Sequence, residues 1–156
     1  MNSDNNSHPL LVVDLDHSLL NTDILYETFW DSIKRNWLIF FKIFSLQKFS
    51  RQRLKSFLVE NSSIDVKNLP YNQKVINFIK EWKLRNKNGE VVMATGSNHA
   101  IASKISSHLK LFDYVFGSDS KTNLSGKNKL NLIKEKFIDR KFDYIGDSIS
   151  DIVIWK

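Results

Sequence analysis

Apolar positions along the chain fall into two patterns, short unbroken runs and longer stretches with helical spacing. Four runs of branched or aromatic residues, at 10–13, 91–94, 114–116 and 142–145, have the length and composition of buried strands. Between and after the later runs, apolar residues recur three or four positions apart. Alternation of strands and helices is typical of a parallel sheet with right-handed connections. We therefore predict an α/β fold with a Rossmann-like parallel sheet.

The block at about residues 22–60 breaks this alternation. Apolar residues at helical spacing predict one helix that starts near Asp23 and another around Leu54 and Phe57. The intervening stretch 37–46 is nearly all apolar but too short to span a bilayer. We expect a small helical cap, inserted after the first strand, that packs over the strand ends. A helix lying in a membrane interface is the alternative.

Length and composition narrow the class of protein. A chain of 156 residues fits one domain with a substantial core, and the absence of cysteine excludes disulfides and thiolate chemistry. Residues 1–9 are polar and are expected to be disordered, which leaves 10–156 as the domain. The N-terminus lacks the parts of a signal peptide, and no apolar run reaches the ~20 residues of a membrane span. The sequence therefore favours a cytoplasmic protein.

The net charge of +6 is concentrated in the predicted insertion. No acidic residue lies between Asp31 and Glu60, whereas this interval holds seven basic ones, Lys34, Arg35, Lys42, Lys48, Arg51, Arg53 and Lys55. Such a stretch can attract phosphorylated molecules or an anionic membrane surface, or can be an ordinary solvated helix face. Aromatic residues interleave with these cations, but we expect them to serve the core and do not expect a nucleic-acid partner.

Polar residues follow the predicted strands where each strand ends. Asp14 and Asp16 come directly after the first strand and Thr95 after the second, while Asp147 and Asp151 follow the fourth. Ligand sites of open α/β sheets form at the carboxyl ends of the strands. Buried carboxylates require a cation or hydrogen-bond donors, so the first pair suggests a metal, although solvated turn-forming aspartates would give the same pattern.

These residues resemble the motifs of the haloacid dehalogenase-like (HAD) superfamily, most of whose members are Mg²⁺-dependent phosphatases. The first motif, D-x-D-x-[TS], corresponds to residues 14–18, Thr95 matches the second-motif hydroxyl, and 146–151 match the acidic fourth motif. The chain is also similar to the phosphatase-like domain that precedes some bacterial polyprenyltransferases. His17 stands where glycine is frequent, and the chain stops soon after the fourth motif, where the family usually continues. We therefore expect a fragment of a longer protein.

The resemblance implies a role for each matching residue. Asp14 would be the nucleophile and Asp16 the general acid and base, while Thr95 and a lysine would stabilise the phosphoryl group. Lys129 is preferred to Lys127 for that lysine, because it precedes Ile133 by one turn of helix. The expected substrate-binding residues are Ser18, Gly96 and Ser97, and the expected Mg²⁺ ligands are Asp14, the carbonyl of Asp16, Asp147 and, nearby, Asp151. His17 is expected to be a neighbour of the site, and Ser97 is also expected to cap the following helix.

The predicted function is Mg²⁺-dependent hydrolysis of phosphomonoesters through an aspartyl-phosphate. A small cap leaves the site open, so the substrate can be a phosphoprotein, including one with phosphotyrosine, or a small phosphate ester. The alternative is a catalytically idle module that docks to a membrane or protein partner through its basic helical insertion. The sequence does not indicate an oligomeric state.

Overall fold

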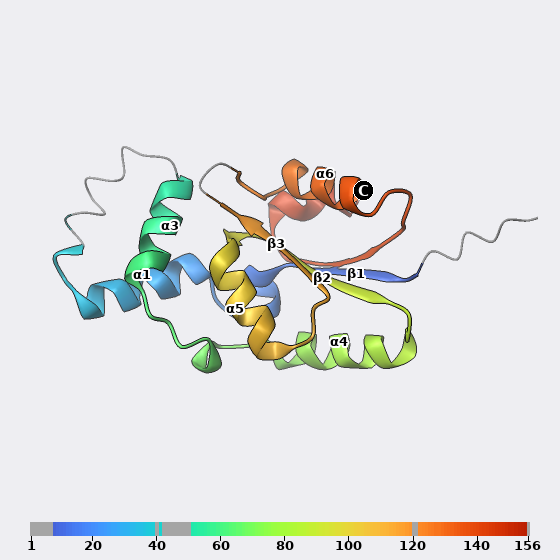
Figure 1. The fold of residues 1–156 in the computed structure, drawn as a ribbon, viewed down its shortest axis with the longest axis horizontal. Helices are drawn as coiled ribbons and strands as arrows, with labels where there is room; N and C mark the ends of the chain where they lie inside the picture. The colour runs from blue at the N-terminus through green and yellow to red at the C-terminus, as the bar shows by residue number, and fades with distance from the viewer. Residues whose placement is uncertain (1–7, 40, 42–50, 120–121, 156) are drawn as a thin grey trace, which may run out of the picture.

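A computed structural model describes residues 8–39, 41, 51–119 and 122–155 of the chain. Its centre is a parallel four-stranded sheet in the order β3-β2-β1-β4 (Figure 1). The strands are β1 (Leu10–Val13), β2 (Glu90–Asn98), β3 (Tyr114–Ser118) and β4 (Asp143–Ile145). The predicted α/β fold with a Rossmann-like parallel sheet is therefore confirmed.

Helices cover both faces of the sheet and its carboxyl edge. They are α1 (Ile24–Arg35), α3 (Arg51–Asn61), α4 (Gln73–Arg85), α5 (His99–Leu109) and α6 (Lys127–Lys136), with short turns η1 (Leu15–Leu19), η2 (Val66–Asn68) and η3 (Ile149–Val153). Figure 1 shows α4 and α5 on one side of the sheet and α6 on the other. The pair α1 and α3 lies beyond the ends of the strands, where the cap was predicted.

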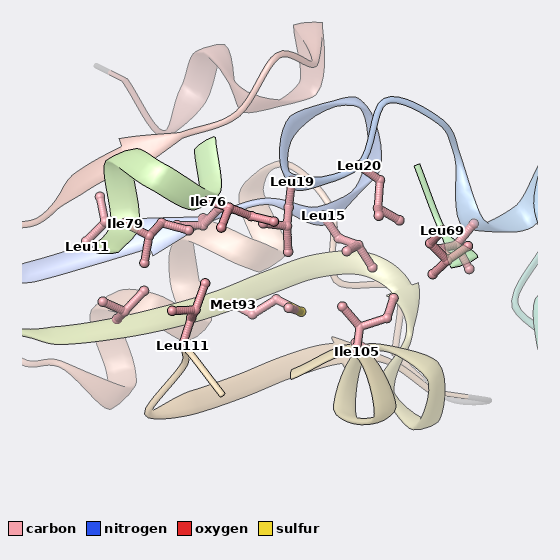
Figure 2. Close-up of a cluster of buried hydrophobic side chains, with 14 of the residues drawn as sticks. Leu11, Leu15, Leu19, Leu20, Leu69, Ile76, Ile79, Met93, Ile105 and Leu111 are labelled. Atoms are coloured by element: carbon pink, nitrogen blue, oxygen red, sulfur yellow. The ribbon is translucent and has the colours of Figure 1, made fainter. Parts of the chain in front are cut away.

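Strand β1 is buried on both faces, and its side chains alternate between two clusters. Leu11 and Val13 belong to the larger core, which α4 and α5 cover and which Figure 2 shows in close-up. Leu10 and Val12 pack on the opposite side with Ile133 of α6. The period-2 alternation of a strand therefore assigns Asp14, the next even-numbered residue, to the side of α6.

The predicted cap leaves the sheet and returns to it at one point. An isolated antiparallel bridge pairs Leu20 with Tyr71. The Asn21 amide donates to the Pro70 carbonyl (2.8 Å) and the Asn72 amide donates to the Leu19 carbonyl (2.9 Å). The two ends of the segment are thus clamped together beside the carboxyl end of β1.

Two expectations about β2 and the helix after it are wrong. The strand continues to Asn98 instead of ending at 94, because after an irregularity it pairs again with β3 through Asn98 and Ser118. The chain therefore stays extended past Ser97, and Asn98 caps α5 by accepting a hydrogen bond from the Ala100 amide (2.9 Å). The Ser97 side chain therefore does not cap α5.

Some expectations fall outside the described residues. The predicted disorder of the N-terminus concerns residues of which only 8 and 9 are described, and most of the apolar stretch 37–46 is likewise not described. Among the helices that the structure does describe, none is long and apolar enough to cross a membrane. The interfacial helix stays a prediction.

The larger core should dominate stability. Leu11→Ala removes a fully buried side chain from β1 and should lower the free energy of unfolding by about 2–5 kcal/mol, because it leaves a cavity in a tightly packed cluster. Leu84→Ala, at a position 77% exposed on α4, is the matched control and should change it by less than about 0.5 kcal/mol. Urea denaturation of both variants measures the difference; equal losses would contradict the assignment of the core.

Candidate active site

The carboxyl end of β1 places two aspartates in different environments. Asp14 still belongs to the sheet, since its amide donates to the Ile145 carbonyl of β4 (2.8 Å), and its side chain is buried. The chain then turns sharply through η1, where His17 adopts a left-handed conformation with φ of 55°. This turn separates the surroundings of Asp14 from those of Asp16.

Lys129 of α6 lies between two buried carboxylates. Its ammonium group is 3.0 Å from Asp14 Oδ1 and 3.1 Å from Asp151 Oδ1, and all three side chains are nearly inaccessible to solvent. A buried lysine requires such partners, because an unpaired charge in the interior is strongly destabilising. Lys127, the alternative considered above, is exposed.

Tyr144 of β4 completes this cluster and was not predicted as a site residue. Its hydroxyl accepts a hydrogen bond from Lys129 (2.8 Å), and burial followed by the charges of Asp14 and Asp151 raises the pKa of Tyr144 far above its usual range. Strand periodicity was the available signal, since Tyr144 packs on the α6 side of the sheet while Ile145 packs on the other. Position 146, just after this strand, requires glycine, because the Cβ of any other residue would lie 2.7 Å from Asp151 Oδ2.

Asp16 is held at the start of the cap. Its Oδ1 accepts a hydrogen bond from the amide of Ile24, the first residue of α1 (2.8 Å), and its Oδ2 accepts one from the Ser97 hydroxyl. A carboxylate at a helix N-terminus is stabilised by the free amides and the helix dipole. The Ser97 hydroxyl, which was expected to cap α5, therefore positions Asp16 instead.

The end of β2 brings further polar groups to the same edge. Thr95 is buried, and its hydroxyl oxygen accepts a hydrogen bond from the Ser97 amide (3.0 Å). The Gly96 carbonyl accepts hydrogen bonds from Ser118 of β3 (2.8 Å) and from Lys55 of α3 (2.6 Å). Lys55 is thus a direct contact between the cap and the sheet. The sequence indicated it only as one of seven basic residues.

The structure places the expected metal ligands at one edge but in unequal surroundings. Asp147 is exposed, whereas Asp151 is fully buried and bound to Lys129. Within the described residues, no group of three or more histidine and acidic side chains is positioned to bind a metal. The expected Mg²⁺ ligands include the main-chain carbonyl of Asp16, so a metal site at this edge would combine carboxylates with a main-chain oxygen. Ser18, an expected substrate contact, is buried and its hydroxyl has no hydrogen-bond partner among the described residues.

Burial shifts the acidity of both first-motif aspartates. Removal from solvent raises the pKa of Asp14 to about 6, even though Lys129 acts in the opposite direction. Burial also raises the pKa of Asp16, against the effect of the hydrogen bonds from Ile24 and Ser97. Both shifts have the same main cause, the removal of a carboxyl group from water.

A pocket of about 650 Å³ opens beside η1, between the two cap helices. His17 lines it, together with residues of the following loop and apolar side chains of α1 and α3. His17 was expected to be only a neighbour of the site. The pocket could not be anticipated from the sequence, because it depends on how α1 and α3 pack.

Comparisons with known proteins give the fold and one relative. No family model matches the chain. An uncharacterized protein, y4nM, from Sinorhizobium fredii is 31% identical over 146 residues, which cover 94% of this chain and 28% of that protein. The chain therefore spans less than a third of the relative's length.

Solved structures with similar folds include HAD-superfamily enzymes. A substrate-bound phosphoserine phosphatase complex matches with a TM-score of 0.62 and 18% identity, over 94% of this chain and 81% of that one. A HAD-superfamily hydrolase from Ehrlichia chaffeensis matches with a TM-score of 0.54 and 21% identity, over 94% and 82%. A protein of unknown function from Bordetella pertussis Tohama I matches with a TM-score of 0.66 and 12% identity, over 94% and 85%. The predicted resemblance to this superfamily is thus confirmed in the fold; the likeness to the polyprenyltransferase-linked domain stays a prediction.

The raised pKa of Asp14 predicts a pH-dependent stability of the metal-free protein. A carboxyl with a pKa of about 6 in the folded state and 3.8 as its ordinary value binds more protons when folded, so the folded state loses stability as pH rises from 4 to 6. Asp14→Asn, which mimics the protonated acid, should raise stability at pH 7–8 by about 2–3 kcal/mol and have little effect at pH 4.

Thermal melts across pH 4–8 in EDTA measure this difference. The exposed Asp147→Asn at the same edge is the control and should change stability by less than about 0.5 kcal/mol throughout. A destabilised Asp14→Asn at pH 8 would show that Lys129 stabilises the ionised carboxylate more than burial destabilises it.

Proposed function

We propose that this chain, which has the fold of the HAD-superfamily hydrolases, is a phosphomonoester hydrolase that works through an aspartyl-phosphate. The observation that carries the proposal is that two aspartates at the end of one strand lie in different surroundings. Asp14 faces a buried lysine, whereas Asp16 is held separately at the start of α1. Two carboxyl groups with different surroundings can divide nucleophilic and acid–base roles between them.

Transfer of the phosphoryl group to the enzyme is the first step. A carboxylate oxygen of Asp14 attacks phosphorus as the bond between phosphorus and the ester oxygen breaks. Asp16 gives its proton to the departing oxygen, which leaves as an alcohol. The raised pKa of Asp16 favours the protonated form that this step requires.

Hydrolysis of the aspartyl-phosphate is the second step. Asp16, now ionised, removes a proton from water as the water oxygen attacks phosphorus. The bond between phosphorus and Asp14 breaks, which releases inorganic phosphate and restores the carboxylate. Because Asp16 regains its proton, the enzyme returns to its starting state.

Charge on the phosphoryl oxygens needs compensation during both steps. Lys129 lies next to the nucleophile, with its ammonium 3.0 Å from Asp14 Oδ1. Thr95 can donate its hydroxyl proton, because its oxygen already accepts a hydrogen bond from the Ser97 amide. Further donors at this edge are the amides near Gly96 and the Ser18 hydroxyl, which has no hydrogen-bond partner in the described part of the chain.

The residues present fit a Mg²⁺ ion. Asp151 Oδ2 is buried without a hydrogen-bond partner among the described residues, and hard oxygen donors are what Mg²⁺ prefers. Asp14, the Asp16 carbonyl and Asp147 would hold the ion, with Asp151 adjacent to them. When bound, it would supply positive charge toward the phosphoryl oxygens and offset the repulsion between Asp14 and the incoming phosphate.

The substrate is a phosphorylated molecule, either a protein or a small ester. The alternative, an idle module docked to a membrane or protein, is favoured by one observation. Tyr26, Trp30 and Trp37 are 59%, 43% and 66% exposed, close in sequence to the basic Lys34 and Arg35. Aromatic and basic side chains together are typical of membrane-interface segments. The alternative would require the buried charge cluster to have no chemical role.

Asp14→Asn should abolish turnover while the protein stays folded, since an amide cannot form the acyl-phosphate. We expect a loss of several orders of magnitude in kcat, on the order of the ~10⁶ seen when catalytic units are broken. Hydrolysis of p-nitrophenyl phosphate, assayed with Mg²⁺, measures it, and circular dichroism checks the fold. Retention of more than a few per cent of activity would contradict the assignment.

Binding of Mg²⁺ should stabilise the protein and be required for turnover. The metal should raise the melting temperature, because it binds only the folded state and relieves repulsion between carboxylates. This shift should be largely lost in Asp14→Asn and retained in Asp143→Asn, an exposed carboxylate of β4. Full activity in a metal-free preparation would overturn the metal site, whereas the nucleophile would then be judged on Asp14→Asn alone.

A further inference from the structure

The pocket between α1 and α3 suggests which phosphate esters the site accepts. We propose that it binds the leaving group of the substrate, and that this leaving group is an apolar alcohol with an alkyl or aryl body. The inference rests on the proposed phosphatase function and narrows its substrate class.

The chemistry of the pocket is the first reason. Its volume of about 650 Å³ lies in the range of small-molecule sites. Apolar side chains from both helices form most of its wall, namely Leu25, Tyr26 and Phe29 of α1 and Leu54 and Leu58 of α3. Burial of a hydrocarbon group against such a wall is favourable in proportion to the apolar area removed from water.

The position of the pocket is the second reason. The general acid must face the ester oxygen that leaves, so the leaving group lies on the Asp16 side of the site. His17, the next residue, lines the pocket, and its amide donates to the Thr22 carbonyl (3.1 Å) in the same wall. The Ile24 amide that holds Asp16 is flanked by two further lining residues, Asp23 and Leu25. The loop that positions the acid therefore also lines the pocket.

The charge of the pocket is the third reason. The lining disfavours a leaving group that carries a carboxylate, such as serine. Among the described lining residues there is no lysine or arginine to bind a carboxylate. Asp23, the acidic residue of this lining, caps α1 by accepting a hydrogen bond from the Leu25 amide (2.7 Å). Lys55 lines a separate small hollow, and its ammonium donates to the Gly96 carbonyl. An amino-acid carboxylate in the pocket would meet Asp23 without a compensating cation.

The test compares n-alkyl phosphates from ethyl to octyl with L-phosphoserine, and uses p-nitrophenyl phosphate to establish turnover. We expect kcat/KM to rise by about two- to fourfold per methylene, the upper value corresponding to full burial of each group. Octyl phosphate should exceed ethyl phosphate by at least about sixtyfold over six methylenes, and should exceed L-phosphoserine by no less.

Tyr26→Ser probes the wall directly, since Tyr26 lines the pocket and is exposed enough to be replaced without unfolding the cap. It should reduce the octyl-to-ethyl ratio of kcat/KM by about fivefold, through loss of apolar contact area. Phe78→Ser is the matched control, because Phe78 is an exposed aromatic residue of α4 that does not line the pocket. It should leave the ratio unchanged.

The two proposals fail in different ways. Hydrolysis of all the esters with no dependence on chain length, or a preference for L-phosphoserine, would overturn the apolar leaving group and leave the phosphatase intact. Equal effects of Tyr26→Ser and Phe78→Ser on the ratio would also overturn it. Failure to hydrolyse any ester, p-nitrophenyl phosphate included, would overturn the phosphatase function itself.

Discussion

The ion pairs that Lys129 makes with Asp14 and Asp151 constrain the rest of the structure. Three elements far apart in sequence, the end of β1, helix α6 and the turn η3, supply the three groups. Removal of Lys129 would cost about 3–5 kcal/mol, because two buried carboxylates would be left without their cation. Two carboxylates sharing one ammonium still carry an excess negative charge, and burial accordingly raises the pKa of Asp14 to about 6. The cluster therefore ties these three elements together at the sheet edge and leaves an excess of negative charge there.

The same edge separates two kinds of chemistry. On the α6 side, Asp14, the proposed nucleophile, pairs with Lys129, which also donates a hydrogen bond to the Tyr144 hydroxyl. On the cap side, Asp16 is held by the first amide of α1, and the next residue, His17, lines a largely apolar pocket. The kinked turn with His17 at its centre makes this division possible, because it directs neighbouring aspartates into different surroundings. In the proposed function, phosphoryl transfer and leaving-group binding thus lie on opposite sides of one short turn.

Much of this arrangement could be predicted from local pattern. The apolar runs located all four strands, and the preference for Lys129 followed from its spacing to Ile133, which packs under the sheet. The wrong predictions depend on tertiary contacts. Pairing with β3 extends β2 beyond Thr95, and Ser97 donates a hydrogen bond to Asp16 instead of capping α5. Contacts such as those of Lys55 and the pocket beside His17 depend on helix packing, for which residue spacing carries no signal.

The bridge between Leu20 and Tyr71 allows the cap segment to change in length during evolution. Because hydrogen bonds already hold the two ends of the intervening segment together, its length hardly affects the rest of the molecule; doubling a loop costs only about 0.6 kcal/mol in closure entropy. Apart from the first turn of α1, which anchors Asp16, and Lys55, which binds the Gly96 carbonyl, this segment can be shortened, extended or exchanged without disturbing the strand register. A different cap can therefore arise on an unaltered sheet, by replacement of a segment whose two ends are joined at one bridge.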